Sequence, residues 1–199
     1  MAGRANPFDW SGGYPALDFV NTLEERPSGA PVEHLATYAD LVRFTELAGL
    51  IKASTATRLR SLAGPDGPRI ARRARELREH LYAILAAAHS GKPVPKTSLD
   101  AIASDVRRAH AVRGLVAAAT TNAVRQDWLS PSSPETPLHA CALAIESLLV
   151  MADHSRIRKC GASDCEVYFI DTSKAHRRQW CSMQNCGNRE KQRRWRCTD

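Results

Sequence analysis

The amino-acid sequence predicts a mainly α-helical protein with a small β-hairpin, in which a helical N-terminal domain precedes a C-terminal zinc module. Apolar residues recur at helical spacing through most of the first part of the chain. Five of the six cysteines lie at or beyond Cys160. Charge is skewed in the same direction, because residues 155–199 hold eleven Lys and Arg against five Asp and Glu. We therefore expect the helical domain over residues 1–153 and the zinc module over residues 154–199.

Three helical patterns are expected first. One covers residues 41–51, the longest runs from Pro68 to Ser90, and a shorter one covers residues 99–109. The longest pattern ends at Gly91 and Pro93, because both residue types interrupt helical geometry.

The following stretch, residues 111–128, has β-branched residues around a Thr120–Asn122 turn, and we expect a short hairpin there. The Ser130–Pro134 loop then breaks the pattern. From Leu138 to Ala152 the apolar residues fall on one face, which predicts a strongly amphipathic helix.

The overall composition narrows the class of protein. No stretch approaches the ~20 apolar residues that span a bilayer, and no apolar run follows Met1–Arg4, so we expect neither a membrane span nor a signal peptide. The expected compartment is the cytoplasm, where cysteines stay reduced and often bind metal. A basic segment joined to a near-neutral body indicates a polyanionic partner.

The strongest motif is two cysteine pairs, Cys160-x4-Cys165 and Cys181-x4-Cys186, separated by fifteen residues. Two close pairs on tight turns are the arrangement that closes a tetrahedral zinc site. A module this small buries too little apolar area to fold alone, so the metal would supply most of its folding energy. The sequence therefore predicts one structural Zn²⁺.

Four alternatives compete with that prediction. The cysteines could be unrelated buried thiols, a disulfide pair, an iron–sulfur site or a catalytic zinc site, although four thiolates leave no open position on zinc. His176 or Cys197 could replace one ligand.

Glu166–Ile170 is expected to form a strand, with Arg177–Trp180 as its return strand.

A basic helix is expected after Cys186. Its residues Arg189, Gln192, Arg193 and Arg196 share one face at helical spacing. Arginine and lysine neutralise phosphates, and arginine, asparagine and glutamine also read bases in the major groove. The residues that we expect to contact DNA are Arg177, Arg178, Asn188, Arg189, Lys191, Gln192, Arg193 and Arg196. The alternative is a solvated charged helix.

The aromatic residues of this module, Trp180 and Trp195, are expected to pack it rather than to stack on bases.

In the N-terminal domain, Asp18, Asn21 and Thr22 are polar residues in an apolar segment and are candidates for lining an effector pocket. Their alternative role is to satisfy buried backbone groups or to cap a helix. No catalytic or nucleotide-binding motif is present, and we expect no enzyme activity.

The C-terminal segment resembles the CGNR zinc-finger family. The motif runs from Trp180-Cys181-Ser182-Met183 to Cys186-Gly187-Asn188-Arg189-x-Lys191, and the first cysteine pair with Phe169-x-Asp171 matches as well. The resemblance implies that the four cysteines bind zinc and that Asn188, Arg189 and Lys191 form the family signature.

The N-terminal segment Leu17–Thr22 resembles the companion domain of that family, called ABATE. Together the two resemblances imply a bacterial, stress-responsive transcription regulator. Our hypothesis is that the zinc module binds duplex DNA, while the helical domain senses a small molecule or forms a homodimer. The rival hypotheses are a zinc-stabilised protein-interaction module and a small-molecule-binding protein with no nucleic-acid role.

Overall fold

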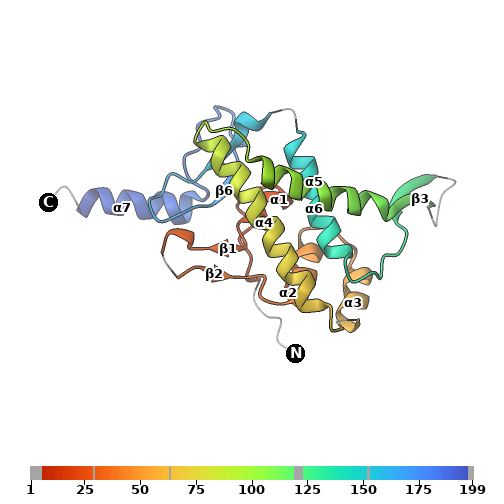
Figure 1. Ribbon diagram of the computed structural model, residues 1–199. Coiled ribbons are helices and arrows are strands. Elements are labelled where there is room, and N and C mark those ends of the chain that lie inside the picture. The colour runs from red at the N-terminus through yellow and green to blue at the C-terminus, as the bar shows by residue number, and fades with distance from the viewer. Residues whose placement is uncertain (1–5, 29, 63, 119–122, 152, 197–199) are drawn as a thin grey trace. The chain divides into compact units, whose positions relative to one another are not determined.

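The computed structural model describes residues 6–28, 30–62, 64–118, 123–151 and 153–196. These residues form helices and short antiparallel hairpins (Figure 1). The helices are α1 (Pro15–Val20), α2 (Tyr38–Leu47), α3 (Ala53–Ser61), α4 (Gly67–His89), α5 (Lys96–Ala111), α6 (Thr136–Leu149) and α7 (Asn188–Arg196). The strands pair as β1 (Leu23–Glu24) with β2 (Val32–Glu33), β3 (Arg113–Ala117) with β4 (Val124–Trp128), and β5 (Ile157–Lys159) with β6 (Tyr168–Ile170). The predicted fold class is confirmed.

Contacts divide the chain into two compact units. One consists of Met1–Leu35 together with Leu148–Asp199, and the other of Ala36–Ser147. The N-terminal segment therefore packs with the cysteine-rich segment, more than a hundred residues away in the sequence. None of the described helices is long and apolar enough to cross a membrane.

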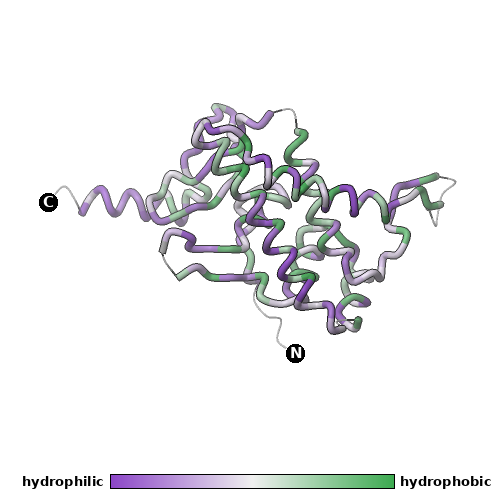
Figure 2. The backbone as a smooth tube through the Cα atoms, in the orientation of Figure 1, coloured by the Kyte–Doolittle hydropathy of each residue, from purple (hydrophilic) through white to green (hydrophobic). Residues whose placement is uncertain are grey.

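The unit formed by Ala36–Ser147 is built on α4. Its apolar stripe, which includes Ile70, Leu77 and Leu81, is buried against α2 and α5. Hydrophobic and hydrophilic residues alternate along α4 with the helical period (Figure 2). Gly91, with a φ of +63°, follows the helix in the left-handed conformation that glycine adopts readily. The predicted long helix is confirmed.

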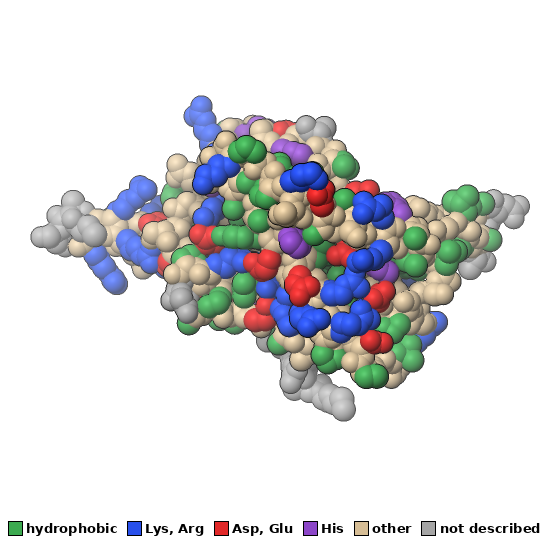
Figure 3. Space-filling view, in the orientation of Figure 1, with side chains coloured by type: hydrophobic (Ala, Val, Ile, Leu, Met, Phe, Trp, Pro, Cys, Tyr) green, Lys and Arg blue, Asp and Glu red, His purple; other side chains and the backbone are tan. Residues whose placement is uncertain are grey.

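The exposed side of α4 is a charged surface (Figure 3). Arg73 contacts Asp105 at 2.6 Å and Glu135 at 3.0 Å, and Arg72 contacts Glu76 at 3.6 Å. These arginines therefore belong to ion pairs on the surface of the unit.

The predicted hairpin in residues 111–128 is also confirmed. β3 and β4 pair in antiparallel register from Arg113 opposite Trp128 to Ala117 opposite Val124. The Thr120–Asn122 turn lies outside the described residues.

The hairpin of the zinc module differs from the prediction. The strand at Tyr168–Ile170 pairs with Ile157–Lys159, and the described residues Arg177–Trp180 form no strand. The predicted return strand was therefore wrong. The reason is local, since the first cysteine turn itself connects the two strands, and the later segment folds around the side chain of Asp171.

Candidate metal centre and basic helix

The four predicted cysteines come together in the structure. The sulfur atoms of Cys160, Cys165, Cys181 and Cys186 all lie within 4.8 Å of one another. The Sγ–Sγ distances are 3.9 Å between Cys165 and Cys181 and 3.5 Å between Cys181 and Cys186. Four thiolates around zinc at ~2.3 Å would be separated by ~3.8 Å in a tetrahedron. The donor set therefore fits one structural Zn²⁺, and these cysteines are free thiols rather than disulfides.

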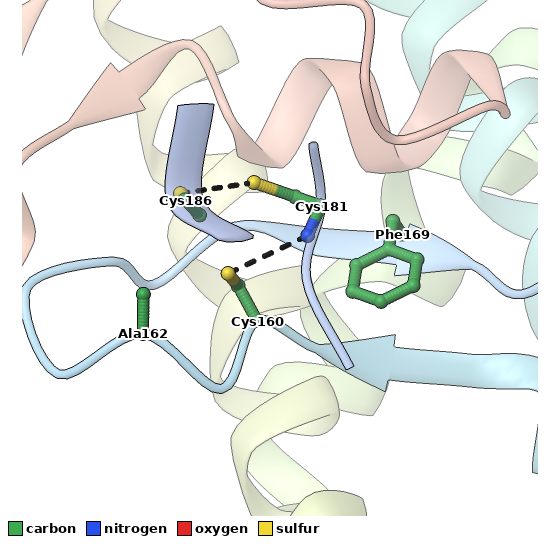
Figure 4. Packing of buried hydrophobic residues seen from close by; sticks show 5 residues of the cluster. All are labelled: Cys160, Ala162, Phe169, Cys181 and Cys186. Atoms are coloured by element: carbon green, nitrogen blue, oxygen red, sulfur yellow. Dashed lines mark hydrogen bonds between the residues drawn. The ribbon is translucent and has the colours of Figure 1, made fainter. Parts of the chain in front are cut away.

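The cysteines form a small core with two apolar residues (Figure 4). Cys160, Cys181 and Cys186 are buried, and Phe169 is fully enclosed beside them. Val167 and Trp180 pack against this cluster from its edge. This cluster is small, so zinc would add to the stability that its apolar side chains provide.

The first cysteine turn is fixed by backbone hydrogen bonds. The amide of Cys160 donates to the carbonyl of Val167 at 2.8 Å, and that of Gly161 donates to the carbonyl of Gln179 at 2.8 Å. A Cβ atom at Gly161 would lie 3.3 Å from that carbonyl oxygen, so a larger residue would push the segments apart. The amide of Cys181 donates to Cys160 Sγ at 3.5 Å, as drawn in Figure 4.

The thiols shift one another's pKa. Hydrogen bonds with Cys165 and Cys181 lower the pKa of the Cys160 thiol, and the hydrogen bond between Cys160 and Cys181 raises the pKa of the Cys181 thiol. Arg189 Nη2 donates to Cys186 Sγ at 3.3 Å. That guanidinium partly offsets the negative charge of a tetrathiolate site.

The second cysteine turn leads directly into α7. Ser182 Oγ accepts from the amide of Asn185 at 3.2 Å, and the carbonyl of Ser182 accepts from the amide of Gly187 at 3.0 Å. A π-helical turn at Met183–Gly187 then continues as the predicted basic helix, Asn188–Arg196. The metal site therefore holds the start of the helix.

The segment after β6 is organised by Asp171. Its buried carboxylate accepts from the hydroxyl of Ser173 at 2.6 Å and from the amides of Ser173 and Arg178, each at 2.9 Å. The hydrogen bond from the Ser173 side chain is the main cause that lowers the pKa of Asp171 to about 2. These hydrogen bonds give Asp171 a structural role in the Phe169-x-Asp171 step.

Two predicted DNA contacts lie on this segment and differ in their surroundings. Arg178 stacks 4.5 Å from the centre of the Phe169 ring and donates to the carbonyls of Trp180 and Cys181. Its guanidinium is therefore held against the module, and the residue is half-buried. Arg177 is exposed.

Asp164 binds two of the predicted arginines of α7. Its carboxylate accepts from Arg189 at 2.8 Å and from Arg193 at 2.6 Å. Arg193 also donates to Ser163 Oγ at 2.6 Å and to Glu190 at 2.7 Å. Burial acts to raise the pKa of Asp164, but the hydrogen bonds from the two arginines outweigh it and lower that pKa. We call Asp164, Arg189 and Arg193 the α7 clamp.

The other predicted contacts on α7 are exposed, namely Asn188, Lys191, Gln192 and Arg196. The Asn188 side chain donates to the carbonyl of Gln184 at 3.1 Å.

Trp180 packs as expected, but Trp195 is 81% exposed, so the prediction that it packs the module was wrong. A ring beyond the last anchored arginine has no core surface to reach. His176 is exposed, and Cys197 lies outside the described residues.

The three polar residues of the N-terminal segment serve the backbone. Asn21 forms two hydrogen bonds with Tyr168, donating to its carbonyl at 2.9 Å and accepting from its amide at 3.1 Å. Thr22 Oγ1 donates to the carbonyl of Phe19 at 2.7 Å, and Asp18 accepts from the amide of Gly12 at 2.9 Å.

Burial raises the pKa of Asp18 to about 7. The hydrogen bonds of Asp18, Asn21 and Thr22 to backbone groups favour the alternative that these three residues satisfy buried backbone groups. Their role as ligand contacts stays a prediction.

A pocket of about 670 Å³ lies beside the cysteines, within the unit that joins the N-terminal and C-terminal segments. Its walls include Asn21 and Arg26 from the N-terminal segment and Glu166, Asn185 and Arg189 from the zinc module. Sequence patterns could not reveal it, because the walls come from segments far apart in the chain. Its volume is typical of small-molecule sites.

Two known families match this chain, one over its N-terminal segment and one over its C-terminal segment. Residues 13–152 match the ABATE family, which carries the description "putative stress-induced transcription regulator", and residues 156–197 match the CGNR zinc finger. A search of curated proteins gives no match. The compact units and the family matches divide the chain differently, so the boundary between residues 153 and 154 stays a prediction. This chain belongs to the ABATE family and carries a C-terminal CGNR zinc finger with one structural Zn²⁺.

Proposed function

We propose that this protein is a DNA-binding transcription regulator whose zinc module contacts duplex DNA through α7. The observation that carries the proposal is the basic helix that begins two residues after the metal-site residue Cys186. That helix has five Lys and Arg against one Glu, and its side chains are largely exposed. A fixed cationic helix neutralises phosphates without a large ordering cost.

We propose fewer DNA-contacting residues than the sequence alone predicted. Arg178 is held by the carbonyls of Trp180 and Cys181, and the α7 clamp occupies Arg189 and Arg193. Lys191 and Arg196 are exposed on α7, and Arg177 is exposed on the preceding loop. We therefore place the main phosphate contacts at these three residues.

A fluorescence-anisotropy titration of the zinc-loaded full chain with a labelled 30-bp duplex tests this proposal. The affinity should fall steeply with salt. A double substitution, Lys191→Ala with Arg196→Ala, should reduce the slope of log K against log salt by up to ~1.8, since each phosphate contact contributes ~0.9.

Lys96→Ala is the matched control, because Lys96 is exposed on α5 in the other unit. Its salt slope should equal that of the wild type. An absence of binding even at low salt would contradict DNA binding and favour the protein-interaction module.

A small-molecule effector is the second part of the proposal, and the pocket beside the zinc site supports it. Ligands found by thermal-shift screening should raise the Tm of the wild type but not of Asn185→Trp, which fills the pocket from its wall. If every stabilising compound acts equally on both proteins, the pocket is not the effector site. We also propose a cytoplasmic, stress-responsive role in a bacterium, with no enzymatic activity.

We also propose that the regulator is a homodimer, because paired half-sites favour two-fold symmetric readers. Sedimentation of the zinc-loaded chain at micromolar concentration tests this, and a monomer at all concentrations would contradict it.

A further inference from the structure

The described residues of α7 present two distinct faces. The clamp turns Arg189 and Arg193 toward Asp164 on the first cysteine turn. Residues at positions 188, 191 and 195 share another face at helical spacing, roughly 150° around the helix at ~100° per residue. We call Asn188, Lys191 and Trp195 the outward face.

The outward face ends in an exposed aromatic ring. Trp195 is 81% exposed, whereas Trp180 packs against the cysteine cluster. The module therefore completes its core without Trp195. Tryptophan is normally well buried, and a ring left in water is a large apolar surface available to a partner.

The charge around this ring identifies the kind of partner. Lys191 lies one helical turn before Trp195, and Arg194 and Arg196 flank it in the sequence. The cationic helix projects from the zinc module in Figure 1, and blue side chains lie along it in Figure 3. A ring among cations suits a polyanion that also offers flat apolar faces, and nucleic-acid bases provide them.

Base faces are accessible only where bases are not stacked within a duplex. We propose that Trp195 stacks on an unpaired base, so that α7 binds DNA containing unpaired bases more tightly than continuous duplex. This inference rests on the proposed DNA binding by the same helix. The clamp contributes because Arg193 anchors the helix two residues before the ring, which limits the freedom lost on stacking.

The test compares three labelled DNAs of equal length with the zinc-loaded full chain: a duplex, the same duplex with a central four-base bubble, and a single strand. The wild type should bind the bubble more tightly than the duplex. Trp195→Ala should weaken bubble binding about 5- to 150-fold, as expected for loss of one stacked base. Its duplex affinity and salt slope should not change.

Trp195→Phe is the matched variant, because it keeps an aromatic face, and it should retain most of the bubble preference. Zinc content is measured for each variant, and quenching of tryptophan fluorescence by the bubble provides a readout on the wild type itself. Equal binding of duplex and bubble, or a bubble preference that survives in Trp195→Ala, would overturn the inference while leaving duplex binding intact. Failure to bind any of the three DNAs would refute the proposed function itself.

Discussion

Replacing Asp164 with asparagine removes the anionic partner of two arginines on α7 while keeping the size of the side chain. In the structure its carboxylate lies 2.8 Å from Arg189 and 2.6 Å from Arg193. The carboxylate is 40% exposed and each arginine side chain is 43% exposed, so solvent screens these pairs. We therefore expect only a small loss of stability, because exposed ion pairs contribute little to the free energy of unfolding.

Asp164→Asn should affect DNA binding more than it affects stability. Phosphate and Asp164 compete for the same guanidinium groups, so the substitution makes two further cations available. If both then contact phosphate, the slope of log K against log salt becomes steeper by up to ~1.8. Binding should tighten most at low salt, where counterion release contributes most.

The assay is the anisotropy titration with a continuous duplex between roughly 50 and 200 mM salt, the range over which phosphate contacts are resolved. Asp100→Asn is the control, because it removes one exposed carboxylate that pairs with Lys96 on α5. An unchanged slope in a zinc-loaded Asp164→Asn protein would refute the competition. Weaker binding at every salt concentration would show instead that the clamp acts mainly by holding the helix.

Three further predictions concern stability. Removing zinc with a chelator should abolish the helical signal of α7 while α4 keeps its own, as measured by hydrogen exchange. Asn21→Ala should cost about 1–3 kcal/mol in denaturant unfolding, because both Tyr168 backbone groups lose their partner. Asp18 keeps its proton in the folded state up to about pH 7 but ionises near 3.8 when unfolded. Stability should therefore fall as pH rises from about 4 to 7, by up to about 4 kcal/mol. Asp18→Asn should abolish this loss, and equal pH profiles for the two proteins would contradict it.

Local patterns were sufficient for several features of this protein. The stripe on α4 follows from spacing within one helix, and the paired cysteines follow from turns of six residues. α3 is different, because its exposed, polar sequence has little apolar periodicity and only Thr55, Ala56 and Leu59 are buried. Such a helix depends on its packing against α2, which no short window of sequence describes.

The sequence by itself determined the zinc ligands and the basic helix, because both depend on residues close together in the chain. Tertiary structure decided which side chains of that helix face outward. Asp164 lies 25 residues before Arg189, and Asn21 lies 147 residues before Tyr168. Contacts over such distances leave no periodic trace in the sequence. Only the folded chain shows that two arginines bind the carboxylate of Asp164 and that Trp195 remains exposed.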